Sequence, residues 1–180
     1  MILHPVFNSS STNEFTGCKE YEKGASVKGL EFEVVWWDQD VIEYLVRCSN
    51  GAFAGAAKMY MGHDDLSNAA TVLRGFPSSN TDSRNIELGT FQPSMAGGGI
   101  HLHFACVDSV GHACVQVKLR ANGCKAMGDS QSVCLLVPVE AGAIDSFVTG
   151  VRGLSNTKGA KAFLQMADHT AGWVQEWLSA

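Results

Sequence analysis

The sequence contains few charged residues and no cluster of basic ones. Charged side chains account for 17% of the 180 residues, and the formal net charge is −5. Proteins that bind nucleic acid need lysines and arginines grouped against the phosphates, and no basic run is present here. We therefore expect no nucleic-acid partner. The hydrophobic content of 46% is typical of a folded globular chain.

Long apolar segments and secretion signals are also missing. No stretch reaches the roughly 18 apolar residues that a membrane-spanning helix requires. The first residues, MILHPVFNSSSTNEF, contain neither the basic start nor the apolar core of a secretory signal peptide. The six cysteines form no CxxC pair, so we expect reduced thiols instead of a disulfide framework. These absences predict a cytoplasmic protein without membrane contact.

Common catalytic motifs are absent as well. There is no G-x-S-x-G sequence, which marks a nucleophilic serine in many hydrolases. The glycines at 97–99 lead into a predicted strand, whereas a phosphate-binding loop leads into a helix. We therefore assign no catalytic residue and no cofactor, and the sequence favours a protein that is not an enzyme.

What the sequence does contain is a series of apolar patterns typical of β-strands. Strands are predicted at 30–37, 41–49, 52–59, 86–91, 99–107, 111–120 and 132–139. Two helices are predicted within 63–77 and 139–154, because apolar residues recur there every three or four positions. The expected fold over 30–154 is α+β, an antiparallel meander sheet of about six to seven strands with two helices packed on one face. Residues 1–29 are expected to form a flexible N-terminal arm, and residues 155–180 a C-terminal helical extension.

Asn50-Gly51 lies between two of these strands and is a strong hairpin signal. A two-residue turn there predicts that Ser49 pairs with Ala52. The same register places Glu43 opposite Lys58, which is a favourable cross-strand charge pair.

A second hairpin contains three histidines, in GGGIHLHFACVDSVGHACVQVKL at residues 97–119. If the chain reverses between Val107 and His112, one face carries only apolar side chains and must be buried. The other face then carries His101 opposite Lys118 and His103 opposite Gln116. The apolar pairs are Cys106 with Ala113, Phe104 with Val115, Leu102 with Val117, and Ile100 with Leu119.

His101 and His103 could both reach one zinc ion, but such a site needs a third ligand. No carboxylate lies on the polar face of these two strands, and Lys118 would repel a cation. We therefore predict no metal ligand and treat His101, His103 and Lys118 as candidate binding residues on an exposed face. Trp36 and Trp37 are consecutive in a strand and should point to opposite faces, with Trp36 in the core. Trp37 is therefore a further candidate contact for a partner.

Near the C-terminus, large apolar residues recur at spacings of 3, 4, 3 and 4, which is typical of one stripe of a helix. This predicts a helix over about 159–179. The stripe either packs on its own domain or forms a homodimer interface, where tryptophan is often an anchor. The candidate interface residues are Phe163, Met166, Trp173 and Trp177, with Thr170 between them.

Five stretches carry a resemblance to a known family: SNGAFAGAAKMY, DDLSNAATVLRGFP, IELGTF, GGGIHLHFACVDSVGHACVQVKL and VPVEAGAIDSFVTGVRGL. In this order they resemble a family of small bacterial proteins known only as a domain of unknown function. The resemblance covers about residues 30–154. It implies a compact α+β domain with an accessory role, for example that of a toxin-immunity-like protein, and it brings no catalytic residues.

The sequence thus predicts a cytoplasmic accessory protein that acts by binding a protein partner or a second copy of itself. The alternative is a small hydrolase or metal-dependent enzyme that uses the face of His101 and His103.

Overall fold

The computed structural model describes residues 27–122, 130–168 and 172–174. The strands are β1 (Gly29–Trp37), β2 (Ile42–Ser49), β3 (Ala54–Met61), β4 (Ser83–Gly89), β5 (Gly98–Cys106), β6 (Ala113–Ala121), β7 (Gln131–Val139) and β8 (Lys161–Gln165). The helices are α1 (Asp65–Leu73) and α2 (Ala141–Arg152), and residues 172–174 form a further helical turn. Among the described residues, no helix is long and apolar enough to cross a membrane.

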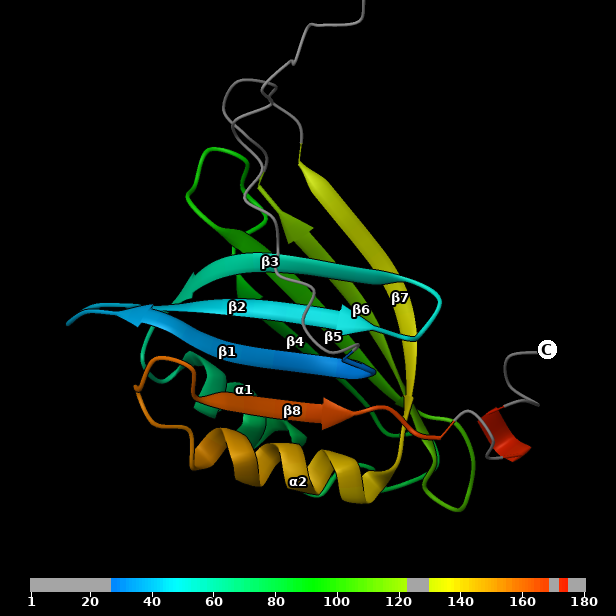
Figure 1. Cartoon of the computed structure of the whole chain (residues 1–180). Helices are drawn as coiled ribbons and strands as arrows, with labels where there is room; N and C mark the ends of the chain where they lie inside the picture. Colours follow the sequence, from blue (N-terminus) through cyan, green and yellow to red (C-terminus); the bar gives the residue numbers. More distant parts are fainter. Residues whose placement is uncertain (1–26, 123–129, 169–171, 175–180) are drawn as a thin grey trace, which may run out of the picture.

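The strands form two four-stranded sheets whose neighbours are all antiparallel (Figure 1). The first sheet has the order β3-β2-β1-β8, and the second has the order β4-β5-β6-β7. Antiparallel strands combined with helices agree with the α+β class, but the single meander sheet is wrong. The chain leaves the first sheet after β3 through α1, and it returns as β8 after α2. Each sheet has one apolar face, and the apolar faces of the two sheets pack against each other. The prediction had only helices covering this face.

The core lies between the two sheets. On one side β3 crosses the second sheet so closely that a Cβ on Gly55 would lie 2.5 Å from Cγ1 of Val133. On the other side α1 and α2 pack against each other and fill the space next to β4 and β8. Phe32 of β1 is fully buried, and its ring lies 6.0 Å from the ring of Phe147 on α2.

The register of the histidine hairpin agrees with the prediction at every pair. His101 pairs with Lys118, His103 with Gln116, and the N–H of Val107 donates to the carbonyl of His112 at 2.8 Å. Phe104 and Val115 on the other face are fully buried. The register predicted for β2 and β3 is wrong by two residues, because Ser49 pairs with Ala54 and not with Ala52.

The β2–β3 connection is longer than expected because the side chain of Asn50 organises it. Its Oδ1 accepts the N–H groups of Ala52 and Phe53, and its own N–H donates to the carbonyl of Phe53. A shift by two residues leaves each side chain on its predicted face. Lys58 therefore still bonds Glu43, at 3.2 Å, but diagonally across the strands.

The C-terminal helix predicted from residue 159 is wrong over residues 161–165. This segment is β8, which pairs antiparallel with β1 from Gly29–Gln165 to Glu33–Lys161. Ala162 and Leu164 are buried, whereas Lys161, Phe163 and Gln165 are exposed, which is the alternation of a strand. β8 therefore belongs to the first sheet. Of the predicted N-terminal arm, residues 1–26 lie outside the described residues.

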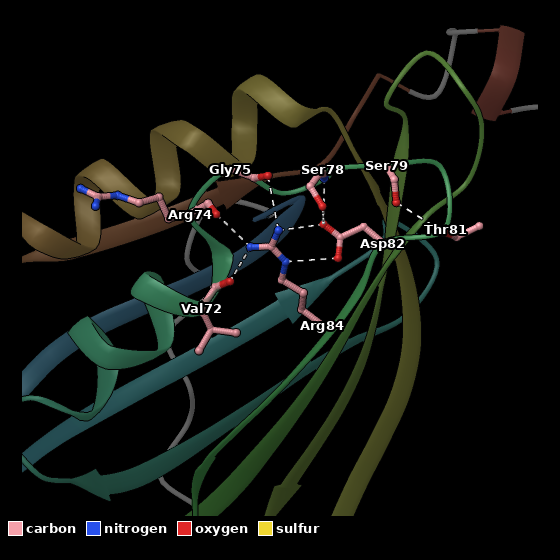
Figure 2. Close-up of polar contacts among 8 residues, drawn as sticks. All are labelled: Val72, Arg74, Gly75, Ser78, Ser79, Thr81, Asp82 and Arg84. Atoms are coloured by element: carbon pink, nitrogen blue, oxygen red, sulfur yellow. Dashed lines mark hydrogen bonds and ion pairs between the residues drawn. The ribbon is translucent and has the colours of Figure 1, made fainter.

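Arg84 of β4 ties the end of α1 to the second sheet (Figure 2). Its Nη1 donates to the carbonyls of Val72 at 2.6 Å and Arg74 at 2.9 Å, and its Nη2 to that of Gly75 at 3.3 Å. These carbonyls lie at the helix C-terminus, where no intrahelical donor reaches them and a positive charge is favourable. Arg84 also forms an ion pair with Asp82, with 2.7 Å between Nη2 and Oδ2.

Asp82 should make the protein sensitive to acid. The hydrogen bond from Arg84, followed by those from Ser78, lowers the pKa of the Asp82 carboxyl below its usual range. A carboxyl whose pKa is lower in the folded chain stabilises it above the pKa of the unfolded chain, and the contribution disappears as the pH falls through the folded value. The Asp82→Asn variant should therefore lose less stability than the wild type when the pH drops below about 4.

Chemical denaturation at a series of pH values measures this effect. Asp145→Asn, at an exposed position of α2, is the matched control and should keep the acid response of the wild type. If the free energy of unfolding fell equally with pH in the wild type and in Asp82→Asn, the acid sensitivity would not come from Asp82.

Candidate functional site

The predicted histidine face is the outer face of the second sheet. One row across it consists of Glu87, His101, Lys118 and Cys134, from β4 to β7. The next row contains His103, whose Nδ1 lies 2.9 Å from Oδ1 of Asn85. Glu87 is a carboxylate beside His101 that the hairpin sequence alone does not show, because β4 precedes it in the chain.

A metal site on this face would need at least three ligands close together. In the part of the chain that the structure describes, no three His, Cys, Asp or Glu side chains are close enough to hold a metal ion. His103 lies beside a shallow hollow that also includes Cys114, and burial raises the pKa of this thiol to about 11. A protonated thiol is a poor nucleophile. His101, His103 and Lys118 lie on one face of the sheet, as the predicted register requires.

Trp36 and Trp37 lie at the end of β1 in the first sheet. The β1–β2 register shifts between Val34 and Trp36, so β1 contains one extra residue at a bulge. The bulge changes the phase of the strand, and the exposed fractions are 46% for Trp36 and 42% for Trp37. The prediction that Trp36 is a core residue is therefore wrong.

Tyr60 lies in the same row of the sheet as Trp36, whereas Trp37 lies in the next row, opposite Ile42. Trp36 pairs with Glu43 of β2, and Glu43 pairs with Tyr60 of β3, which is 39% exposed. The hydroxyl of Tyr60 donates to Oε1 of Glu43 at 3.3 Å. We call Trp36, Trp37 and Tyr60 the aromatic end of the first sheet. Sequence reasoning missed Tyr60, since the wrong hairpin register hid its position in the row of Trp36, on the other side of Glu43.

Four carboxylates lie in two loops at this end of the first sheet. Asp38 and Asp40 lie in the β1–β2 turn, and Asp64 and Asp65 lie at the start of α1. His63 joins these two loops, because its Nε2 lies 3.0 Å from the carbonyl oxygen of Asp38. Hydrogen bonds from the N–H groups of Val41 and Asp40 lower the pKa of Asp38. The surface around the tryptophans is therefore negatively charged at neutral pH.

The middle of the same sheet face is neutralised by ion pairs. Nη1 of Arg47 lies 2.7 Å from Glu31 and 2.6 Å from Glu33. Nζ of Lys161 lies 3.3 Å from Glu31 and 3.4 Å from Glu33. Burial raises the pKa of Glu33, but the bond to Arg47 and the charge of Lys161 outweigh it, and the net pKa is lowered. The unbalanced negative charge is thus at the aromatic end.

Trp173 packs on the protein's own surface and stacks on His112 of the β5–β6 turn. The two rings are 4.3 Å apart at 8°, and Nε1 of Trp173 donates to Oε1 of Glu140 at 3.1 Å. Nδ1 of His112 lies 2.5 Å from Oδ2 of Asp108. Of the other candidate interface residues, Met166 is buried, Phe163 is 40% exposed, and Trp177 lies outside the described residues.

Comparison with protein-family models, curated proteins and solved structures finds no match to this chain. The resemblance of residues 30–154 to an uncharacterised bacterial family therefore rests on the sequence stretches alone, and it stays a hypothesis.

Proposed function

We propose that this protein is an accessory binding module that docks a basic partner protein on the aromatic end of its first sheet. The observation that carries the proposal is the exposure of Trp36 and Trp37, at 46% and 42%, beside a turn that carries Asp38 and Asp40. Tryptophan and tyrosine dominate the binding energy of many protein interfaces. An exposed tryptophan pair that no structural role explains therefore favours a contact surface.

The charge of this surface selects the partner. Asp38, Asp40, Asp64 and Asp65 attract lysine and arginine side chains, and the indole rings bind such cations through their faces. The overall net charge of −5 would also steer a basic protein towards the chain. A toxin-immunity-like role, which the sequence resemblance implies, is one case of this kind of binding.

The test compares partner capture from a lysate of the native host by three forms of the protein. The Trp36→Ala/Trp37→Ala double variant should lose a captured protein that is identified and carries a net positive charge. Phe53→Ala removes a ring that is 68% exposed in the β2–β3 loop, and it should bind like the wild type. High salt should weaken the wild-type complex because the carboxylates contribute to it.

The proposal fails if no partner is captured, if the partner is acidic, or if the double variant binds as well as the wild type. The alternative function is that of a small hydrolase or metal-dependent enzyme that uses the face of His101 and His103. It predicts turnover of a hydrolase substrate, and this turnover should disappear in a His101→Ala/His103→Ala variant.

A further inference from the structure

The outer face of the second sheet carries positive charge on β6. The outward side chains there are Gln116, Lys118 and Arg120 in succession, and the register places His101 of β5 opposite Lys118. Lys118 is exposed and Arg120 is partly buried, and neither forms an ion pair with a described residue. Nε of Arg120 is buried without a hydrogen-bond partner in the same part of the chain. The described residues therefore leave both charges uncompensated.

Acidic groups are scarce on this sheet. Its four strands contain one acidic residue, Glu87 of β4. His101 lies between Glu87 and Lys118, and neighbouring strands are about 4.8 Å apart, so about 10 Å separates the main chains at Glu87 and Lys118. The part of the face over β6 and β7 is therefore cationic, although the whole chain has a net charge of −5.

An open hollow lies on the same face, among β5, β6 and β7. Its lining includes the apolar side chains of Ala105, Cys114 and Leu136. Leu136 is 39% exposed, and Val107, which also lines the hollow, is 38% exposed. Covering such side chains removes apolar surface from water, so the hollow favours an apolar group of a ligand. Along β6 the hollow comes first, and the two cationic side chains follow it.

We propose that this face binds an extended acidic segment of a partner protein, which lies along β6. An apolar side chain of the segment enters the hollow, and two carboxylates contact Lys118 and Arg120. Charge complementarity selects the acidic groups, and a guanidinium can bind a carboxylate through two parallel hydrogen bonds. His101 has no hydrogen-bond partner among the described residues, and its imidazole can donate to the carboxylate at Lys118.

The spacing of the three contacts fits an extended chain. Every second residue of a strand points to the same side, and such residues are about 7 Å apart. Lys118 and Arg120 are separated by one such step, and the hollow lies beside Gln116, one step before Lys118. A segment in which one apolar and two acidic residues alternate with small polar ones therefore presents one side chain to each position.

This surface is separate from the aromatic end. The two sheets pack together by their apolar faces, so their outer faces point away from each other. The aromatic end takes a basic partner, whereas the outer face of the second sheet takes an acidic one. The Trp36→Ala/Trp37→Ala variant should bind the acidic segment like the wild type, so each of the two proposals can fail alone.

Backbone-amide NMR of the full chain tests the inference with a synthetic peptide as the probe. The peptide is Gly-Leu-Ser-Glu-Ser-Glu-Gly with blocked termini, and it should shift the amides of Lys118, Arg120 and Leu136 until they saturate. Lys118→Glu/Arg120→Glu should raise the Kd of the peptide by about tenfold or more. Lys28→Glu/Lys158→Glu makes the same change of charge at exposed positions outside the second sheet, and it should bind like the wild type. The spectra also show whether each variant is folded.

Two changed peptides test the ligand on the wild type alone. Serine in place of leucine, or lysine in place of both glutamates, should raise the Kd by about tenfold or more. The inference is overturned if the first peptide shifts no amide of this face, or if Lys118→Glu/Arg120→Glu or either changed peptide leaves the Kd unaltered. Equal shifts with inorganic phosphate or a single-stranded oligonucleotide would overturn it too. So would shifts of these amides with protein concentration alone, because the acidic end of a second copy would then occupy the face.

Discussion

Replacing Phe104 by alanine is expected to lower the free energy of unfolding by about 3–5 kcal/mol, the usual cost of truncating a buried phenylalanine. Phe104 is fully buried in β5, and its ring meets the ring of Phe76 edge-on at 5.9 Å. The substitution removes apolar contacts and leaves a cavity between the sheets, where the packed strands allow little collapse. Urea denaturation of the wild type and the variant measures the difference.

His101→Ala is the matched control, since His101 lies three residues earlier on the same strand and on the opposite face. Because the imidazole of His101 is only half-buried, its removal leaves no internal cavity. The free energy of unfolding should therefore fall by about 0.5 kcal/mol or less. Equal costs for the two variants would contradict the assignment of the faces of β5.

The register of this hairpin was predictable from sequence because two independent features agree on it. Oδ1 of Asp108 accepts the N–H groups of Val110, Gly111 and His112 and fixes the turn. A one-residue slip would move every apolar side chain of β5 to the solvent face. In the β2–β3 hairpin, a shift by two residues keeps every apolar side chain on the same face, so the apolar pattern does not fix the register. The hydrogen bonds of the Asn50 side chain stabilise the longer loop.

The division into two sheets could not be predicted from the strand patterns. Alternation shows that a strand has a buried face, but it does not show whether a helix or another sheet covers that face. The same limit explains β8. Its five residues, KAFLQ, alternate in the structure, but the apolar spacing of the whole C-terminal segment resembles a helix.

The candidate surface was predicted only in part. Trp37 was assigned to a partner contact from its place in the strand, and it lies at the aromatic end. Trp36 joins it because the bulge in β1 changes the strand phase, and no sequence signal marks that bulge. Tyr60 joins it through the β2–β3 register. Exposed surfaces depend on such irregularities more than cores do, since a core is constrained by many contacts at once.

The second large effect is expected at Arg84. Replacing Arg84 by alanine should lower the free energy of unfolding by about 2–4 kcal/mol, because it leaves three main-chain carbonyls and a carboxylate without their charged donor. The guanidinium also lies over the ring of Phe76, 5.3 Å from its centroid, and Phe76 in turn packs on Phe104. Arg84 therefore connects the end of α1, the loop that follows it and the core in one set of contacts (Figure 2).

Two variants separate this geometry from charge alone. Arg84→Lys keeps the positive charge, but one ammonium group cannot serve the carbonyls of Val72, Arg74 and Gly75 together with Asp82, so it should recover less than half of the loss. Arg74→Ala removes an exposed guanidinium at the same helix end, which Figure 2 shows pointing away from Arg84. It should cost about 0.5 kcal/mol or less, as exposed sites do. If Arg74→Ala costs as much as Arg84→Ala, or if Arg84→Lys restores full stability, the helix end is held by net charge and not by the five directed bonds of Arg84.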